Sequence, residues 1–308
     1  MKIAVMGTGG VGGYFGAKLA RSGCDVTFIA RGAHLAAIRE RGLSVKNSGG
    51  DLHVVPARAT ADPREVGAVD LVLFGVKLWD TATAVRAIRP LLGSHTAVIS
   101  FQNGVVKDDI LIEALGADAV VGGVCYIAAT IAEPGIIAHT GTMQRLVFGE
   151  YDGRRSARVE RFEAACRAAG IDAEVSADIR RAIWEKFVFL VAFSAITAVT
   201  RRPIGAVRAH PHTRRLLAAA MQEVIDVGRA QGVALAPDFV ADRLRFADQL
   251  PESMTSSMAN DLERGNRLEA PWLSGDVARR GATLGVPTPV NGTLFDVLSL
   301  AADGTAAN

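Results

Sequence analysis

A glycine-rich hexapeptide lies between an apolar run at residues 2–6 and a stretch with helical character. At this spacing the first glycine permits a tight turn and the second lets the backbone approach a diphosphate. The third allows the helix and the strand to pack closely. The alternative is an ordinary glycine turn. We predict a dinucleotide whose diphosphate lies at the helix N-terminus, bound by Gly7, Thr8, Gly9, Gly10, Val11 and Gly12.

The end of the second apolar run indicates which nicotinamide nucleotide binds. Enzymes that use NAD place Asp or Glu there to hold the ribose hydroxyls, whereas this chain has Arg31. A guanidinium can bind the 2′-phosphate of NADPH through charge-assisted hydrogen bonds. The alternative is a solvated loop arginine. The sequence therefore favours NADPH over NADH.

Two more polar side chains follow predicted strands. Lys77 comes after the run that ends at Val76, and Asn103 follows Phe101 and Gln102. Ligands of open α/β sheets bind beyond the carboxyl ends of the strands, so both residues are expected to face the cofactor cleft. Lys77 could reach a phosphate, the nicotinamide ribose or the substrate, and the Asn103 amide can donate and accept. The alternatives are a solvated lysine and a plain turn.

The elements that position these residues alternate between strand and helix, which predicts a parallel sheet. Five short apolar runs are typical of strands: residues 3–6, 26–29, 71–76, 98–101 and 120–124. The run at 71–74 is apolar at every position, as in a strand covered by helices on both faces. This pattern predicts a Rossmann-type, doubly wound α/β domain.

The chain then changes character. After Pro134 and Gly135, residues 136–139 and 146–149 are expected to form a β-hairpin, followed by a helix at 155–169 and a strand at 172–175. From about residue 176 the pattern is helical, with turns near Arg202, Gly232, Pro251 and Gly285. We predict an NADPH-binding domain at residues 1–176 and a helical substrate-binding and catalytic domain at residues 177–308.

Composition excludes several classes of protein. The 308 residues are 49% hydrophobic, which suffices for two packed cores and argues against disorder. The net charge is +2 without a basic block, which argues against nucleic acid as the main partner. A small-molecule substrate is the expected partner. Cys24, Cys125 and Cys166 lack the spacing of a disulfide framework or a zinc site.

The sequence also gives expectations about location. The longest apolar run, residues 187–196, is too short to span a bilayer and follows Glu185 and Lys186. We expect a buried helix and no membrane association. The N-terminus lacks the basic region, apolar core and cleavage site of a signal peptide, so the expected location is cytoplasmic.

Taken together, the motifs resemble the ketopantoate reductases (2-dehydropantoate 2-reductases), NADPH enzymes of pantothenate synthesis. The resemblance covers nearly the whole chain. It is carried by G-T-G-G-V-G at 7–12, A-R-G at 30–32, V-K-L-W at 76–79, Q-N-G at 102–104, W-E-K-F at 184–187, S-S-M at 256–258 and Glu269 ahead of L-S-G. It implies a Rossmann domain joined to a mostly helical domain, with the substrate in the cleft between them.

The resemblance also implies roles for single residues. Lys186 would be the general acid, and Glu269 would help to hold the active site. Lys77 and Asn103 would lie beside nicotinamide and substrate, and Ser257 would bind the substrate carboxylate. The chemistry agrees, because an ammonium can stabilise and protonate the oxygen that hydride transfer leaves charged. The alternatives are an ion-paired structural lysine and a solvated glutamate on a helix face.

The chain departs from the family at places where other members have asparagines. Here they are Leu190, Ser194, Arg201 and Met254. Lost amides remove hydrogen bonds to a hydroxyl-bearing keto acid, although Ser194, Arg201 or Arg202 could supply an anion contact. Two alternatives to ketopantoate reduction follow. One is a related reductase for a more apolar carbonyl or imine, and the other is a non-catalytic NADPH-binding sensor.

The sequence therefore predicts an NADPH-dependent 2-oxo acid reductase without a metal. His210 and His212 flank Pro211 and are expected to form a helix-entry turn. Family resemblance makes a homodimer a further expectation.

Overall fold

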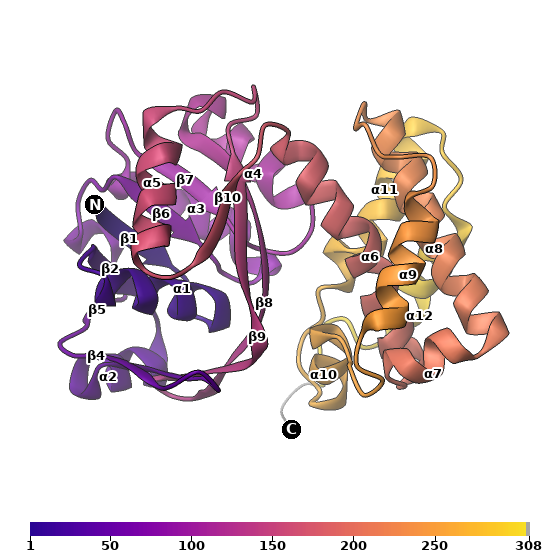
Figure 1. Ribbon diagram of the computed structural model, residues 1–308, viewed down its shortest axis with the longest axis horizontal. Helices are drawn as coiled ribbons and strands as arrows, with labels where there is room; N and C mark the ends of the chain where they lie inside the picture. Colours follow the sequence, from indigo (N-terminus) through magenta and orange to yellow (C-terminus); the bar gives the residue numbers. More distant parts are fainter. Residues whose placement is uncertain (306–308) are drawn as a thin grey trace. The chain divides into compact units, whose positions relative to one another are not determined.

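The computed structural model describes residues 1–305. The contacts within it divide the chain into two compact units, one of Met1–Asn103 with Lys107–Ala182 and one of Gly104–Val106 with the chain from Ile183 on. Figure 1 shows the first as strands with helices and the second as packed helices. The predicted fold class is confirmed. The division falls inside helix α6 (Ile179–Thr200), a few residues after the predicted boundary.

The first unit contains a parallel sheet with strand order β5–β2–β1–β6–β7–β8. Its strands are β1 (Lys2–Met6), β2 (Asp25–Ile29), β5 (Arg58–Thr60), β6 (Leu71–Phe74), β7 (Ala97–Ser100) and β8 (Val120–Glu133). The strand order reverses between β1 and β6, which is the point where ligands of such sheets bind. Each of the five predicted runs coincides with one of these strands, although the runs at 71–76 and 98–101 continue past the ends of β6 and β7. The short β5 was not foreseen.

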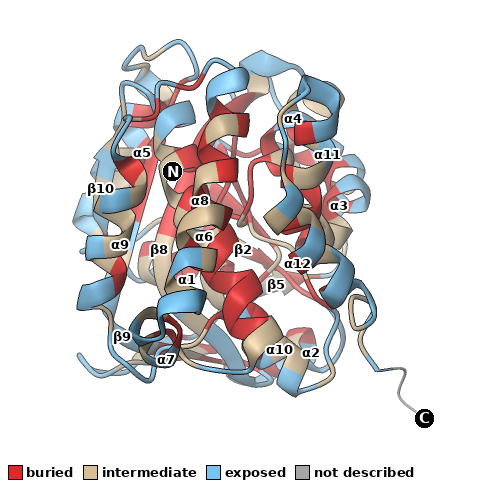
Figure 2. Cartoon of the chain, turned by 90° about the vertical axis from the view of Figure 1, so that its right-hand side faces the viewer, coloured by how far each residue is buried: buried red, intermediate tan, exposed pale blue. Residues whose placement is uncertain are grey.

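The central strands β1, β6 and β7 are buried on both faces. Ile3 and Val5 belong to one apolar core, whereas Ala4 and Met6 belong to another, because successive side chains of a strand point to opposite faces. Figure 2 shows buried residues on the inner sides of the helices and exposed residues on their outer faces. The first core takes side chains from α1 (Gly10–Arg21), α2 (Gly32–Arg41) and α5 (Ala157–Ala168), the second from α3 (Thr81–Ala87) and α4 (Val106–Leu115).

A second group of strands extends from β8. Figure 1 shows β8 and β9 (Ile136–Gly149) as a long antiparallel pair. β9 also pairs in parallel with β3 (Leu43–Lys46) and β10 (Asp172–Val175), and β3 pairs with β4 (Leu52–Val54). The strand at 172–175 was predicted, whereas β3 and β4 were not.

The predicted hairpin between residues 136–139 and 146–149 was wrong, because both segments belong to β9. The hairpin is instead β8 with β9, and its turn contains Gly135 with a φ of +82°. Ile127 pairs with Gln144 but Ala129 already pairs with His139. The intervening residues of β9 form a bulge around Gly141 (φ +78°), which accommodates a sequence that resembles a turn without ending the strand.

The second unit is built around α6. Its other helices are α7 (Ile204–Ala209), α8 (Pro211–Ala230), α9 (Phe239–Gln249), α10 (Ser257–Glu263), α11 (Ser274–Leu284) and α12 (Pro289–Ser299). By length and composition α6 could cross a membrane, but 67% of its most apolar window is buried in the structure. It is therefore the buried helix that the sequence predicted. As expected, His210 and Pro211 begin a helix, α8.

Candidate active site

The glycine-rich turn after β1 is shaped by contacts that leave no room for a side chain. Gly7 has a φ of +95°, and a Cβ there would lie 2.7 Å from the Val76 nitrogen. A Cβ on Gly12 would lie 2.3 Å from the Gly7 carbonyl oxygen. Thr8 anchors the turn to β2, since its backbone nitrogen and its hydroxyl donate to the Ile29 carbonyl at 3.1 and 3.0 Å.

Gly9 differs from its neighbours. A Cβ at Gly9 would meet nothing within 4 Å, so open space lies in front of the backbone at this point. Gly9 is also the N-cap of α1, with no side-chain cap and no acidic residue in the first turn. The first amides of a helix lack intrahelical partners, and they favour an anion. The residues present therefore fit the diphosphate of a dinucleotide.

Gly10 has a second role that the motif did not indicate. A Cβ there would lie 2.0 Å from the carbonyl oxygen of Ala129. The start of α1 thus packs directly against the extended part of β8, and glycine is needed at this position for packing as well as for the predicted cofactor contact.

Arg31 stands where the sequence placed it, two residues after β2 and at the N-cap of α2. Its side chain is exposed. Within residues 1–305 no hydrogen bond or ion pair engages its guanidinium. The first turn of α2 contains no acidic residue. The arginine is therefore available to an anion.

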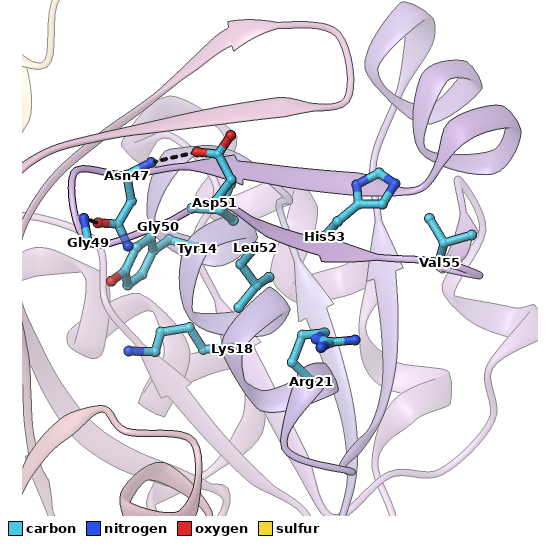
Figure 3. A pocket seen from close by; sticks show the side chains of 11 residues that line it. Tyr14, Lys18, Arg21, Asn47, Gly49, Gly50, Asp51, Leu52, His53 and Val55 are labelled. Carbon is cyan, nitrogen blue, oxygen red and sulfur yellow. Dashed lines mark hydrogen bonds between the residues drawn. The ribbon is translucent and has the colours of Figure 1, made fainter.

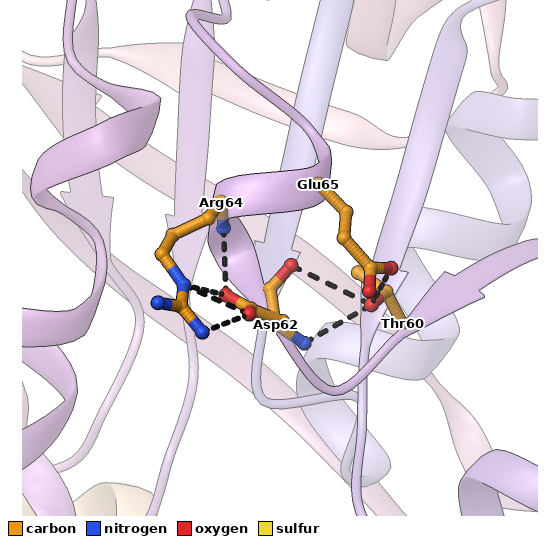
Figure 4. A network of polar contacts seen from close by, with 4 residues as sticks. All are labelled: Thr60, Asp62, Arg64 and Glu65. Atoms are coloured by element: carbon orange, nitrogen blue, oxygen red, sulfur yellow. Dashed lines mark hydrogen bonds and ion pairs between the residues drawn. The ribbon is translucent and has the colours of Figure 1, made fainter.

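A polar network that the sequence analysis missed follows β5, the strand next to β2 (Figure 4). The Thr60 hydroxyl donates to Glu65 at 2.6 Å and accepts from the Asp62 nitrogen at 3.0 Å. The Arg64 side chain donates hydrogen bonds to the Asp62 carboxylate, with Nη2 at 2.6 Å from Oδ2. These hydrogen bonds hold the pKa of Asp62 below its usual value. The Asp-Pro start of a helical turn at 62–63 is the signal that could have revealed it.

Lys77 and Asn103 follow the adjacent strands β6 and β7, as predicted. Lys77 is exposed, with its Nζ 5.4 Å from the centre of the Trp79 ring. Asn103 is half-buried. Buried Gln102 links the two segments, because its Nε2 donates to the Val76 carbonyl at 2.9 Å and to Thr81 at 2.8 Å. The first half of the predicted site thus lies along one edge of one sheet.

In the helical unit, Lys186 is half-buried on α6. The nearby rings of Trp184 and Phe187 are buried and pack edge to face, with their centres 5.6 Å apart. Leu190 and Ser194 follow at intervals of four residues, so the three share one face of the helix. Ser194 is only 1% exposed. The predicted proton donor therefore belongs to a mostly apolar and largely buried helix.

Ser256 joins α10 to α6 through hydrogen bonds, and the sequence analysis did not select it. Ser256 is buried and caps α10 by accepting from the Ala259 nitrogen at 3.0 Å. It also accepts from Thr197 at 2.8 Å and donates to the Ser194 carbonyl at 3.4 Å. The predicted carboxylate ligand Ser257 is the next residue and is exposed. Ser194 and Ser257 thus come from segments that are hydrogen-bonded to each other.

Glu269 lies on a third segment of this unit. It is half-buried and is the N-cap of the 3-10 turn η5 (Ala270–Trp272), which leads into α11.

A separate cavity of about 690 Å³ lies between the second half of α1 and the β3–β4 hairpin (Figure 3). Tyr14, Lys18 and Arg21 line it from the helix, and Asp51 and His53 line it from the hairpin. None of the predicted site residues is among those that line it.

Two family models match the chain. The model described as ketopantoate reductase PanE/ApbA matches residues 3–153, and the model for its C-terminal part matches residues 178–302. The chain belongs to the ketopantoate reductase family. Members of this family are oxidoreductases that use NADPH, and this chain is one of them.

Known proteins resemble the chain along its whole length. The 2-dehydropantoate 2-reductase of Mesorhizobium japonicum is 36% identical, and the match covers 97% of this chain and 96% of the relative. The crystal structure of a PanE/ApbA family ketopantoate reductase from Ralstonia eutropha matches with a TM-score of 0.90 and 37% identity over 98% of each chain. A D-mandelate dehydrogenase solved with NADH and anilino(oxo)acetate shares the fold at 21% identity, with a TM-score of 0.89 over 98% of each chain.

Proposed function

We propose that this family member reduces a 2-oxo acid to a 2-hydroxy acid with NADPH, and that its substrate is 2-dehydropantoate (ketopantoate), which becomes pantoate. The observation that carries the proposal is Lys186, a half-buried lysine on a mostly apolar helix in which Trp184 and Phe187 are buried. The name of the Mesorhizobium japonicum relative supports the substrate.

In this mechanism the bound cofactor supplies a hydride to the keto carbon. Lys186 stabilises the charge that develops on the substrate oxygen and donates the proton to it. Asn103 and Lys77 orient the reacting groups from the sheet edge. Ser257 and Ser194 hold the substrate carboxylate, and Glu269 supports the site.

A specific observation favours a second candidate. Leu190 lies one turn after Lys186 on the same face of α6, and Met254 is 38% exposed just ahead of α10. Both are apolar, which suits a carbonyl or imine substrate without a hydroxyl group. The fold alone does not choose between substrates, since a mandelate dehydrogenase shares it.

The test is NADPH oxidation by the purified protein with ketopantoate and a panel of other 2-oxo acids, alongside Lys186→Ala. We expect turnover of ketopantoate that falls by about 10²–10⁴-fold in the variant. Lys46→Ala is the matched control, because Lys46 pairs with Asp51 on the β3–β4 hairpin. Turnover of another panel member in place of ketopantoate would favour the second candidate. Tight NADPH binding without any turnover would favour the sensor.

The cytoplasmic location and the homodimer stay predictions. Cell fractionation would test the first, and light scattering of the purified protein would test the second.

A further inference from the structure

We infer that Arg64 is a positioning residue for cofactor choice: it holds the Asp62 carboxylate away from Arg31, so that Arg31 stays available to the 2′-phosphate. This inference rests on the proposed use of NADPH. It concerns the network after β5 rather than the phosphate-binding turn itself.

The strand register brings the acid and the arginine to the same end of two neighbouring strands. β2 and β5 run parallel with Ile29 opposite Thr60, and the Ala30 nitrogen donates to the Thr60 carbonyl at 3.0 Å. Two residues beyond that pair stand Arg31 and Asp62, both with extended backbone. Neighbouring strands lie about 4.8 Å apart, which is within the reach of an arginine side chain. An Asp62 without a partner would therefore be an ion-pair partner for Arg31.

In the structure Asp62 is already fully engaged. The Arg64 Nε lies 2.9 and 2.8 Å from the two carboxylate oxygens, and the Arg64 backbone nitrogen donates to Oδ1 at 2.9 Å. Pro63 begins the turn that puts Arg64 in this place. The other acid of the loop, Glu65, accepts from the Thr60 hydroxyl. Neither carboxylate pairs with Arg31 among the residues described.

The negative charge of Asp62 would affect NADPH binding if Arg64 did not pair with it. The hydrogen bonds from Arg64 lower the pKa of Asp62, so the carboxylate is ionised at neutral pH. Without Arg64 this negative charge would attract the Arg31 guanidinium and repel a phosphate dianion. NADH lacks the 2′-phosphate, so its binding would change much less.

The experiment compares the dissociation constants of NADPH and NADH, measured by fluorescence, for Arg64→Ala and for the double variant Asp62→Asn/Arg64→Ala. We expect Arg64→Ala to weaken NADPH binding by about fivefold, because the pair is largely exposed. NADH binding should stay within about twofold. The double variant should regain wild-type NADPH affinity, because the repelling charge is gone.

Arg58→Ala is the matched control. Arg58 pairs with Asp25 at the opposite end of the same two strands, Nη1 to Oδ1 at 2.7 Å, and its loss should change neither affinity. Circular dichroism checks that every variant is folded.

Two results would overturn the inference while leaving the proposed function intact. Unchanged NADPH affinity in Arg64→Ala would show that Asp62 does not compete. A double variant as weak as Arg64→Ala would show that Arg64 itself contacts the phosphate. If the wild-type protein bound NADH as well as NADPH, the proposed cofactor choice would fail together with the inference.

Discussion

The two units of this protein differ in how their predicted ligand contacts would be made. In the sheet unit the diphosphate would be bound by the backbone, because Gly7 and Gly12 shape the turn and Gly9 leaves it open. In the helical unit the predicted contacts come from side chains on α6 and α10, notably Lys186 and Ser257. A backbone site depends on missing Cβ atoms, whereas a side-chain site can change its specificity without a change of fold.

The same contrast explains where the chain departs from its family. The predicted cofactor residues match the family motif from Gly7 to Arg31. The departures, Leu190, Ser194, Arg201 and Met254, all belong to the helical unit. We infer that these departures bear on the substrate rather than on the dinucleotide.

Among the changes in stability and binding, the largest is expected at the glycine turn, where two alanine substitutions should have different effects. In Gly12→Ala the new Cβ would clash with the Gly7 carbonyl and cost about 1–3 kcal/mol of stability. In Gly9→Ala the fold has room, so stability should be kept while NADPH binds about tenfold more weakly, a loss of about 1.4 kcal/mol.

Urea unfolding and NADPH titration of both variants separate these effects. Normal NADPH affinity in a folded Gly9→Ala would show that the open space is not where the diphosphate lies.

A smaller effect is expected from two adjacent serines at the start of α10. Ser256→Ala removes the helix cap and the hydrogen bond from Thr197, so we expect a loss of about 1–2 kcal/mol in unfolding free energy. Ser257→Ala removes an exposed hydroxyl and should leave stability unchanged while raising KM for the 2-oxo acid. Equal KM values for Ser257→Ala and the wild-type protein would remove Ser257 from the substrate site.

The smallest effect is expected from a substitution on α6 that should change substrate preference. Leu190→Asn restores an amide one turn after Lys186. If one hydrogen bond to the ketopantoate hydroxyl is regained, the ratio of kcat/KM for ketopantoate to that for 2-oxobutanoate should rise by about fivefold. NADPH affinity should not change. A ratio that stays level or falls would show that Leu190 does not face the substrate.

The sequence predicted the parallel sheet because short, mostly apolar runs are separated by helical stretches. It missed β3, β4 and β5, which are three or four residues long and contain polar residues. The β9 strand was misread because the bulge at Gly141 resembles a turn locally. Only its pairing with β8 keeps the chain extended there.

For the site, the sequence identified residues whose role follows from a motif. It did not identify residues whose role is to hold other segments in place, namely Gln102, Ser256 and Arg64. Gln102 bonds to Val76 and Ser256 to Thr197, partners that only the folded chain brings together. Whether Glu269 supports catalysis stays a prediction.

The most direct test of the separation between cofactor binding and catalysis is a pair of measurements on Lys186→Ala. These are its dissociation constant for NADPH and its kcat with the best substrate of the panel. We expect wild-type NADPH affinity with turnover reduced by about 10²–10⁴-fold. Turnover close to that of the wild-type protein would contradict the central role of Lys186. A parallel loss of NADPH affinity would contradict the separation of cofactor binding from catalysis.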